Sequence, residues 1–131
     1  MDGPGVGCGA AIVRDGKLLL IRRARAPEAG CWSLPGGKVD LWEPVEAAVR
    51  REIAEELGIA LGAVRLVCVV DHMADGQHWV SPTYLAETFD GEPAIQEPEK
   101  HTGLGWFALD ALPTPLSGIV TVAVAALRER A

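Results

Sequence analysis

A single predicted helix constrains this chain more than any other feature. It extends from Pro44 to Leu57, and its apolar residues recur every fourth position on one face: Val45, Val49, Ile53 and Leu57. Pro44 suits the first turn, where its missing N–H has no partner in the helix, and Gly58 is typical of a C-cap. A helix with one such apolar stripe must pack against a hydrophobic core.

Three glutamates lie along the edge of that apolar face: Glu52, Glu55 and Glu56. At about 100° per residue they fall within about 100° of one another on the helix surface. Charges held this close repel one another, and a bound cation relieves the repulsion. Carboxylate-only clusters suit hard cations, and Mg²⁺ typically combines a few carboxylates with substrate phosphates. The pattern therefore indicates a candidate metal site.

The alternative interpretation is a solvated acidic face stabilised by i,i+4 pairs such as Arg51–Glu55. Two neighbouring features favour the metal site. Gly36-Gly37 precedes the helix and allows a ligand to approach the backbone closely. Glu43 lies at the helix N-terminus, where the helix dipole favours negative charge.

The segment also carries a resemblance to a known family. Its spacing is Gly37, five residues, Glu43, seven residues, and then Arg51-Glu52-Ile53-Ala54-Glu55-Glu56-Leu57-Gly58-Ile59. This matches every fixed position of the Nudix box, G-x5-E-x7-R-E-U-x-E-E-x-G-U, in which U is a bulky aliphatic residue. The preceding Gly30-Cys31-Trp32-Ser33-Leu34-Pro35-Gly36 is similar to the family's usual lead-in. The chain therefore resembles Nudix hydrolases of the MutT type over nearly its whole length.

The resemblance implies a fold of the α/β (α+β) class: the Nudix αβα sandwich, a mixed curved β-sheet flanked by helices. The order of predicted elements agrees with it: a hairpin of 9–13 and 17–21 around Asp15-Gly16, short strands at 32–34 and 104–108, strands 64–70 and 79–87, and a second helix, 117–128, capped by Ser117. Pro82 places strand 79–87 near an edge or a bulge. We expect one domain over 1–131, with a flexible Gly-rich start at 1–7.

The resemblance also implies roles for the box residues. Glu52, Glu55 and Glu56 resemble the ligands of Mg²⁺ (or Mn²⁺), and the Gly37 carbonyl often joins them. Glu52 is in addition a candidate base for the attacking water, and Glu55 belongs to the same catalytic group. Arg51 resembles the residue that orients a box glutamate, with Glu43 as its partner.

Candidate substrate contacts lie mainly outside the box. Arg23 follows the second strand, where MutT-type enzymes place an arginine that faces the substrate; the alternative is a solvated side chain. Gly36 and Gly37 offer backbone groups. Asp71-His72 and His78-Trp79 could line a base pocket, with Trp79 or Tyr84 stacking on the base, although strand aromatics are more often core residues.

A charged loop after the second predicted strand pair offers one more candidate. Glu97-Pro98-Glu99-Lys100-His101 is similar to a segment of the triphosphate-cleaving branch, in which a loop glutamate adds a metal ligand or base. The sequence does not choose between Glu97 and Glu99, and a solvated loop is the alternative.

Composition limits the kinds of partner and compartment that suit this chain. The formal net charge of −6 argues against binding to nucleic-acid backbones, which requires a positive field. Three widely spaced cysteines without a CxxC argue against disulfides and structural zinc. No signal peptide or long apolar run is visible, so we expect a cytoplasmic protein without a membrane partner. A homodimer remains open.

The resemblance favours Mg²⁺-dependent hydrolysis of a nucleoside diphosphate linked to another group, with a (d)NTP cut to (d)NMP and pyrophosphate as the leading case. Pyrophosphatases of ADP-ribose, dinucleoside polyphosphates or sugar nucleotides are the alternatives. Met73-Ala74-Asp75-Gly76, downstream of the box, carries neither the proline frequent in ADP-ribose hydrolases nor the tyrosine frequent in dinucleoside-polyphosphate hydrolases. A non-catalytic nucleotide-sensing module and an enzyme acting on RNA 5′ ends are the competing classes.

Overall fold

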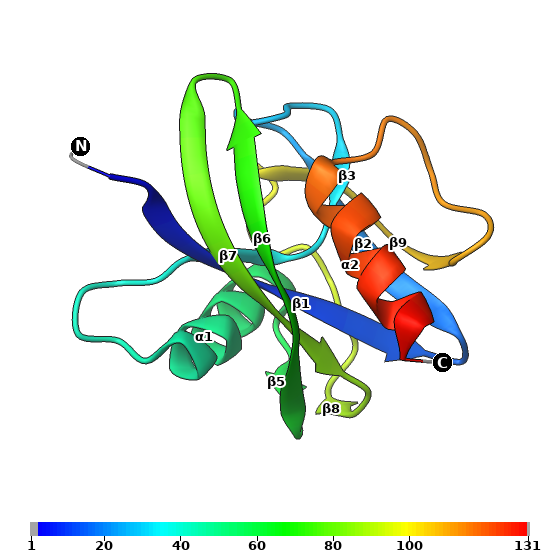
Figure 1. Ribbon diagram of the computed structural model, residues 1–131. Coiled ribbons are helices and arrows are strands. Elements are labelled where there is room, and N and C mark those ends of the chain that lie inside the picture. The colour runs from blue at the N-terminus through cyan, green and yellow to red at the C-terminus, as the bar shows by residue number, and fades with distance from the viewer. Residues whose placement is uncertain (1–2, 131) are drawn as a thin grey trace.

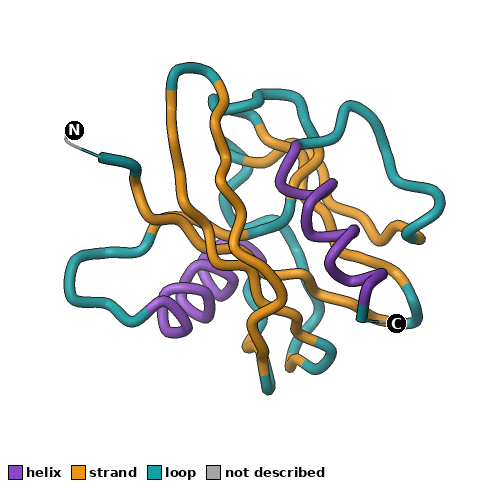
Figure 2. The backbone as a smooth tube through the Cα atoms, in the orientation of Figure 1, coloured by secondary structure: helices purple, strands orange, loops and turns teal. Residues whose placement is uncertain are grey.

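A curved mixed sheet lies between two helices in the computed structural model, which describes residues 3–130 (Figure 1). The elements follow the chain as β1 (Gly5–Arg14), β2 (Lys17–Arg23), β3 (Trp32–Ser33), β4 (Gly36–Lys38), α1 (Val45–Leu57), β5 (Ala60–Leu61), β6 (Val64–Ala74), β7 (Gln77–Ala86), β8 (Phe89–Asp90), β9 (His101–Ala108) and α2 (Gly118–Glu129). The predicted fold class, a Nudix-type α+β sandwich, is confirmed by this arrangement (Figure 2).

The sheet is mixed because one of its neighbouring strand pairs is parallel. Its main path runs β3-β2-β1-β7-β6, with β4 added to β1 and β9 added to β2. Strands β1 and β7 are parallel, and the other pairs are antiparallel. Strands β5 and β8 form a separate two-stranded pair.

Alternation along β2 creates two cores, one on each face of the sheet. Leu19 and Ile21 join the core beneath α1, whereas Leu18 and Leu20 join the core beneath α2. Successive strand residues point to opposite faces, so a continuous apolar run requires cover on both sides. The two helices supply that cover.

Helix α1 is positioned by its apolar stripe. Val49, Ile53 and Leu57 are fully buried, as the four-residue repeat predicts. Gly58 ends the helix in the left-handed conformation, with φ 70°, and its N–H bonds to the Ala54 carbonyl. Pro44 lies one position earlier than expected: it is the N-cap, in an extended conformation, and the helix begins at Val45.

Helix α2 is capped as predicted. The Ser117 hydroxyl accepts a hydrogen bond from the Ile119 N–H at 3.3 Å. Val120, Ala123 and Val124 are the buried residues of the helix. Among residues 3–130, neither helix is both long enough and apolar enough to cross a membrane.

Two sequence expectations differ from the structure. Strand β1 begins at Gly5, which pairs with Trp79, so Gly5–Gly7 are not the flexible start that was expected; Met1 and Asp2 lie outside the described residues. Strand β7, with Pro82, is interior, flanked by β1 and β6, so its predicted position at an edge is wrong. The alternative of a nearby bulge is correct, because β6 has a register shift between Leu66 and Cys68.

Candidate active site

A glycine turn brings the backbone to the carboxylates of α1. A Cβ atom on Gly36 would lie 2.1 Å from the Cys8 carbonyl oxygen, and one on Gly37 would lie 2.3 Å from the Glu52 carboxyl carbon. Only glycine therefore fits at position 36, where the close atom is backbone, whereas a side chain at position 37 would displace the Glu52 carboxylate. The Gly36 N–H donates to Glu56 Oε1 at 2.8 Å, which fixes the turn against the helix.

Arg51 is the centre of the charge network. Its Nε and Nη2 donate to the two oxygens of Glu43 at 2.7 and 2.9 Å, and Nη1 donates to Glu52 at 2.9 Å. The same Nη1 reaches Glu55 at 3.3 Å. A planar fork of fixed donors can hold several carboxylates at once, so one guanidinium sets the positions of three of them.

The glutamates of the acidic edge differ in exposure. Glu56 is almost completely buried, the Glu52 side chain is 16% exposed, and that of Glu55 is 51% exposed. Burial raises the pKa of Glu52 above its ordinary value, and the like charges of Glu56 and Glu55 raise it further against the opposing effect of Arg51. The cluster therefore carries unrelieved repulsion.

Glu56 has a second buried partner. His101, at the start of β9, places Nε2 2.9 Å from Glu56 Oε2, and its Nδ1 is buried without a hydrogen-bond partner among the described residues. Because a carboxylate only accepts, His101 carries its proton on Nε2. Glu56 is thus held from two sides, by Gly36 and by His101.

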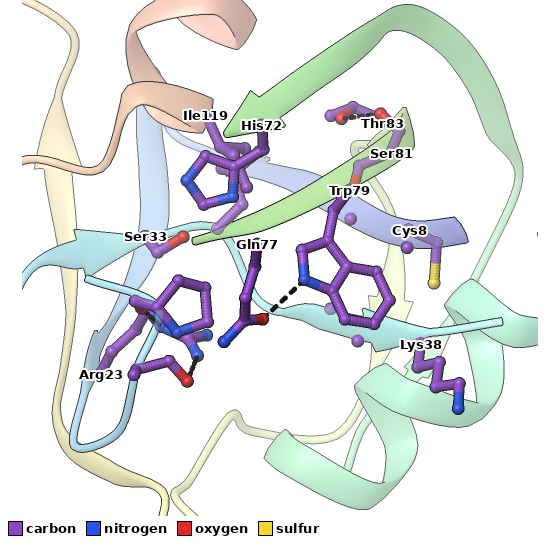
Figure 3. A pocket seen from close by; sticks show the side chains of 17 residues that line it. Cys8, Arg23, Ser33, Lys38, His72, Gln77, Trp79, Ser81, Thr83 and Ile119 are labelled. Carbon is purple, nitrogen blue, oxygen red and sulfur yellow. Dashed lines mark hydrogen bonds between the residues drawn. The ribbon is translucent and has the colours of Figure 1, made fainter. Parts of the chain in front are cut away.

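A cavity of about 280 Å³ opens beside the glycine turn (Figure 3). Alternate residues of β7 form one wall: Gln77, Trp79, Ser81 and Thr83. Gly36 and Gly37 belong to its lining, so the cavity meets the acidic edge of α1 at this turn. A pocket of this size suits a small planar or sugar-sized group.

The opposite wall of the cavity carries positive charge. Arg23 lines it, with Nε donating to the Pro27 carbonyl at 2.6 Å and Nη2 to the Ala26 carbonyl at 3.3 Å. Burial lowers the pKa of Arg23, while the negative charges of Glu56 and Glu28 oppose that effect. Lys38 lies on the lining too, next to Gly37. The cavity can therefore receive an anionic group beside the glycine turn.

The predicted base-pocket residues separate into two groups. His72 and Trp79 are register partners on β6 and β7, and both line the cavity. Tyr84 does not, and its assignment to this pocket is wrong: it packs against the core beneath α1. Tyr84 is five residues from Trp79, and an odd separation along a strand puts two side chains on opposite faces.

A family model for the NUDIX domain matches residues 3–127. This chain belongs to the Nudix family. The predicted membership of the MutT-type Nudix hydrolases is confirmed by a solved MutT NUDIX hydrolase from Burkholderia pseudomallei, which is 63% identical with a TM-score of 0.94 and covers 96% of this chain and 99% of that one.

Curated relatives are similar over most of the chain. An ADP-ribose pyrophosphatase of Methanocaldococcus jannaschii is 36% identical over 113 residues, which is 84% of this chain and 65% of the relative. A putative 8-oxo-dGTP diphosphatase 2 of Mycobacterium tuberculosis is 39% identical over 98 residues, 73% of this chain and 67% of the relative. The match thus spans about two thirds of the length of these relatives.

The Nudix box residues fit a divalent cation by their chemistry. The acidic edge and the Gly37 carbonyl offer only hard oxygen donors, and the missing Cβ of Gly37 gives Glu52 access to the backbone. Among residues 3–130, no three acidic, His or Cys side chains converge closely enough to surround an ion. Arg51 binds Glu52 and Glu55, while His101 and the Gly36 N–H bind Glu56, so each of the three carboxylates has a protein partner in the structure.

The two loop glutamates of this Nudix domain lie in different surroundings. Glu97 pairs with Lys100 at 3.2 Å, and the charges of Glu52 and Glu56 contribute to the raised pKa of Lys100, after the larger effect of Glu97 itself. Glu99 is exposed. Glu97 is therefore the one whose surroundings include the acidic edge.

Sequence reasoning missed Glu28 and gave no role to His101. Glu28 links three segments that line the cavity: it accepts from Ser117 Oγ at 2.7 Å, pairs with His72, and its own N–H donates to Asp75 at 2.7 Å. Burial alone would raise the pKa of Glu28, but the hydrogen bonds from Ser117 and His72 lower it overall. Both residues act through partners distant in sequence, which no local pattern indicates.

Cys8, the cysteine on the cavity lining, is not poised to act as a nucleophile. Cys8, Cys31 and Cys68 are free in the structure. Burial raises the pKa of Cys8 to about 11, so the thiol beside the cavity stays protonated at neutral pH.

Proposed function

We propose that this Nudix protein hydrolyses a phosphoanhydride bond in a nucleoside diphosphate linked to another group, with Mg²⁺ (or Mn²⁺) as cofactor. A (d)NTP, cut to (d)NMP and pyrophosphate, is the leading substrate. One observation carries the proposal: the glycine turn is at once a partner of the acidic edge and a wall of the cavity. A nucleotide in the cavity would extend its phosphates along this turn to the carboxylates.

Glu52, Glu55, Glu56 and the Gly37 carbonyl would hold the ion, which when bound neutralises phosphate charge and lowers the pKa of water. Glu52 takes the proton of the attacking water as the water oxygen bonds to phosphorus. The bond from that phosphorus to the bridging oxygen then breaks, and pyrophosphate leaves.

The remaining charged residues position these groups. Arg51, held by Glu43, fixes the orientation of Glu52. His101 and the Gly36 N–H fix Glu56. Arg23 and Lys38 would attract the phosphate chain. Glu97 is the loop glutamate we propose as an additional ligand or base, in preference to Glu99.

The second candidate substrate is ADP-ribose. It is supported by the name of the Methanocaldococcus jannaschii relative, whereas the Mycobacterium tuberculosis relative is named for an oxidised dGTP. A panel of NTPs, dNTPs, 8-oxo-dGTP, ADP-ribose, dinucleoside polyphosphates and sugar nucleotides, with products identified, decides between them. Tight binding without turnover of any member would favour a sensing module instead.

The mutational test uses the acidic edge. We expect Glu55→Gln and Glu56→Gln to reduce kcat by about two orders of magnitude or more, since each removes charge that acts on the phosphates. Glu46→Gln is the matched control, because Glu46 lies on the same helix but pairs with Arg50 at 3.9 Å, away from the cluster. Full activity in both edge variants would contradict the metal site.

The setting of the reaction is also a proposal. Free cysteines fit a reducing, cytoplasmic compartment. The net charge of −6 supports a small nucleotide rather than a nucleic acid as partner. Exposed Leu66, Val69 and Met73 on the edge strand β6 could bury one another in a homodimer, and the molecular mass in solution tests this.

A further inference from the structure

Gln77 is the residue at the mouth of the cavity whose hydrogen-bonding direction is fixed. It is the first residue of β7 and shares a face with Trp79. The Trp79 Nε1–H donates to Gln77 Oε1 at 2.9 Å. An indole N–H can only donate, so the carboxamide must turn its oxygen to Trp79. Its NH₂ group then points elsewhere, and Figure 3 shows it on the side of Arg23.

The position of Gln77 is held by the backbone. Ala74 pairs with Gln77 across the two-residue turn Asp75-Gly76, whose φ angles of 51° and 73° are both positive. Such a tight turn leaves the first residue of the following strand little freedom. The Asp75 carboxylate also accepts from the Glu28 N–H at 2.7 Å, which ties the hairpin tip to the opposite loop.

Trp79 is fixed as well. A Cβ on Gly5 would lie 2.6 Å from the six-membered ring of Trp79, so the indole packs directly on the β1 backbone. The ring therefore presents a stable aromatic surface, and beside it a carboxamide whose oxygen accepts from the indole and whose NH₂ can donate. This arrangement suits a flat heteroaromatic ring with an acceptor on its edge.

We propose that Gln77 is a specificity-determining residue, whose amide NH₂ donates to a carbonyl oxygen or ring nitrogen of a nucleobase packed against Trp79. The inference rests on the proposed function for its choice of ligand, but it concerns binding and not cleavage. Trp79 acts through Gln77, because its N–H sets which end of the carboxamide meets the base.

The test compares Gln77→Glu with Gln77→Met in the full chain. Glutamate keeps an acceptor for Trp79 and has the same shape, but it replaces the donor with an acceptor. We expect Gln77→Glu to weaken binding of the dNTP that binds wild type most tightly by about tenfold or more, and Gln77→Met by about two- to tenfold. Inorganic tripolyphosphate, which has no base, controls for the added charge. Gln77→Met should bind tripolyphosphate as wild type does. Gln77→Glu should lose much less affinity for tripolyphosphate than for the dNTP.

A double-mutant cycle tests the role of Trp79. Trp79→Phe removes the N–H and keeps an aromatic ring. Part of the affinity for the dNTP that this substitution costs in wild type should therefore not be lost in the Gln77→Met background. Strictly additive effects would contradict the coupling. Binding is measured calorimetrically with Ca²⁺, and folding is checked by thermal unfolding.

The outcomes separate the two proposals. Equal dNTP binding by wild type and both Gln77 variants, or equal loss for dNTP and tripolyphosphate, overturns the role of Gln77 even if the chain is an active hydrolase. Wild type that binds dNTPs through Gln77 but cleaves none of the panel overturns the proposed function alone. No binding of any dNTP by wild type overturns the role of Gln77 and the choice of a (d)NTP as leading substrate, and turnover of ADP-ribose in the panel would then still support the hydrolase.

Discussion

At the scale of single residues, Arg51 decides how the acidic edge behaves without an ion. Its guanidinium donates two hydrogen bonds to Glu43, whereas Glu52 and Glu55 share a single donor nitrogen, Nη1. Glu43 is therefore stabilised as an anion, whereas Glu52 remains an anion in unfavourable surroundings. The two carboxylates should respond to pH in opposite ways.

Glu43 should contribute to acid resistance. Hydrogen bonds from Arg51 and from the Asp40 N–H hold its pKa at about 2, against an ordinary value of 4.5. A depressed pKa stabilises the fold above about pH 4.5, and this contribution is lost as pH falls toward 2. We expect Glu43→Gln to lower the unfolding temperature at pH 6, and we expect its unfolding temperature to fall less on acidification than that of wild type. Glu46→Gln is the control and should behave as wild type. Parallel curves for wild type and Glu43→Gln would contradict the pairing.

Glu52 should destabilise the metal-free protein. Its raised pKa means that the folded state disfavours the anion. The free energy of unfolding therefore falls as the pH rises from the pKa of Glu52 in the unfolded chain through its pKa in the folded protein. In EDTA at neutral pH, Glu52→Gln should therefore unfold at a higher temperature than wild type and gain less from added Mg²⁺. A lower unfolding temperature for Glu52→Gln in EDTA would show that its bond to Arg51 outweighs the repulsion.

At the scale of elements, close backbone approach links β1 to both halves of the site. Gly5 supports Trp79, and the Cys8 carbonyl lies where a side chain on Gly36 would be. A Cβ on Gly7 would likewise lie 2.6 Å from Ser81 Oγ, so close packing against β7 explains the glycines at positions 5 and 7. A strand with few side chains pairs weakly alone, but β4 and β7 hold it on both sides.

Gly5→Ala should change substrate binding more than catalysis. The added Cβ would lie 2.6 Å from the Trp79 ring, so the indole must shift and carry Gln77 with it. We expect KM for the nucleotide to rise by about three- to tenfold, equivalent to the loss of one neutral hydrogen bond, with kcat within about twofold of wild type. Gly3→Ala is the control, since nothing lies within 4 Å of its Cβ position. A fall in kcat alone would place the effect in the acidic edge instead.

Sequence patterns predicted the elements whose signal is local. The stripe of Val49, Ile53 and Leu57 predicts α1, and Asp15-Gly16 predicts the first hairpin, because each pattern involves residues that are neighbours in the chain. The interior place of β7 was not predicted, since Pro82 interrupts its strand signal and its partner β1 lies far away in sequence.

At the scale of the whole molecule, the sheet separates two tasks. The core beneath α1 fixes the acidic edge, and the cavity lies on the other face, where Ile119 of α2 forms part of its lining. The glycine turn is the place where the two faces meet. Box residues could be assigned from sequence because they share one helix, whereas Glu28 and His101 depend on contacts with residues far away in the sequence.

The central claim is that the acidic edge of α1 binds a divalent ion beside a bound nucleotide. Electron paramagnetic resonance of Mn²⁺ with a non-hydrolysable dNTP analogue measures this directly, through the ion that the protein removes from solution. We predict that wild type and Glu46→Gln bind Mn²⁺ more tightly than the analogue alone does, and that Glu56→Gln loses most of this gain. Equal Mn²⁺ binding by wild type and Glu56→Gln, or none by wild type, would contradict the account.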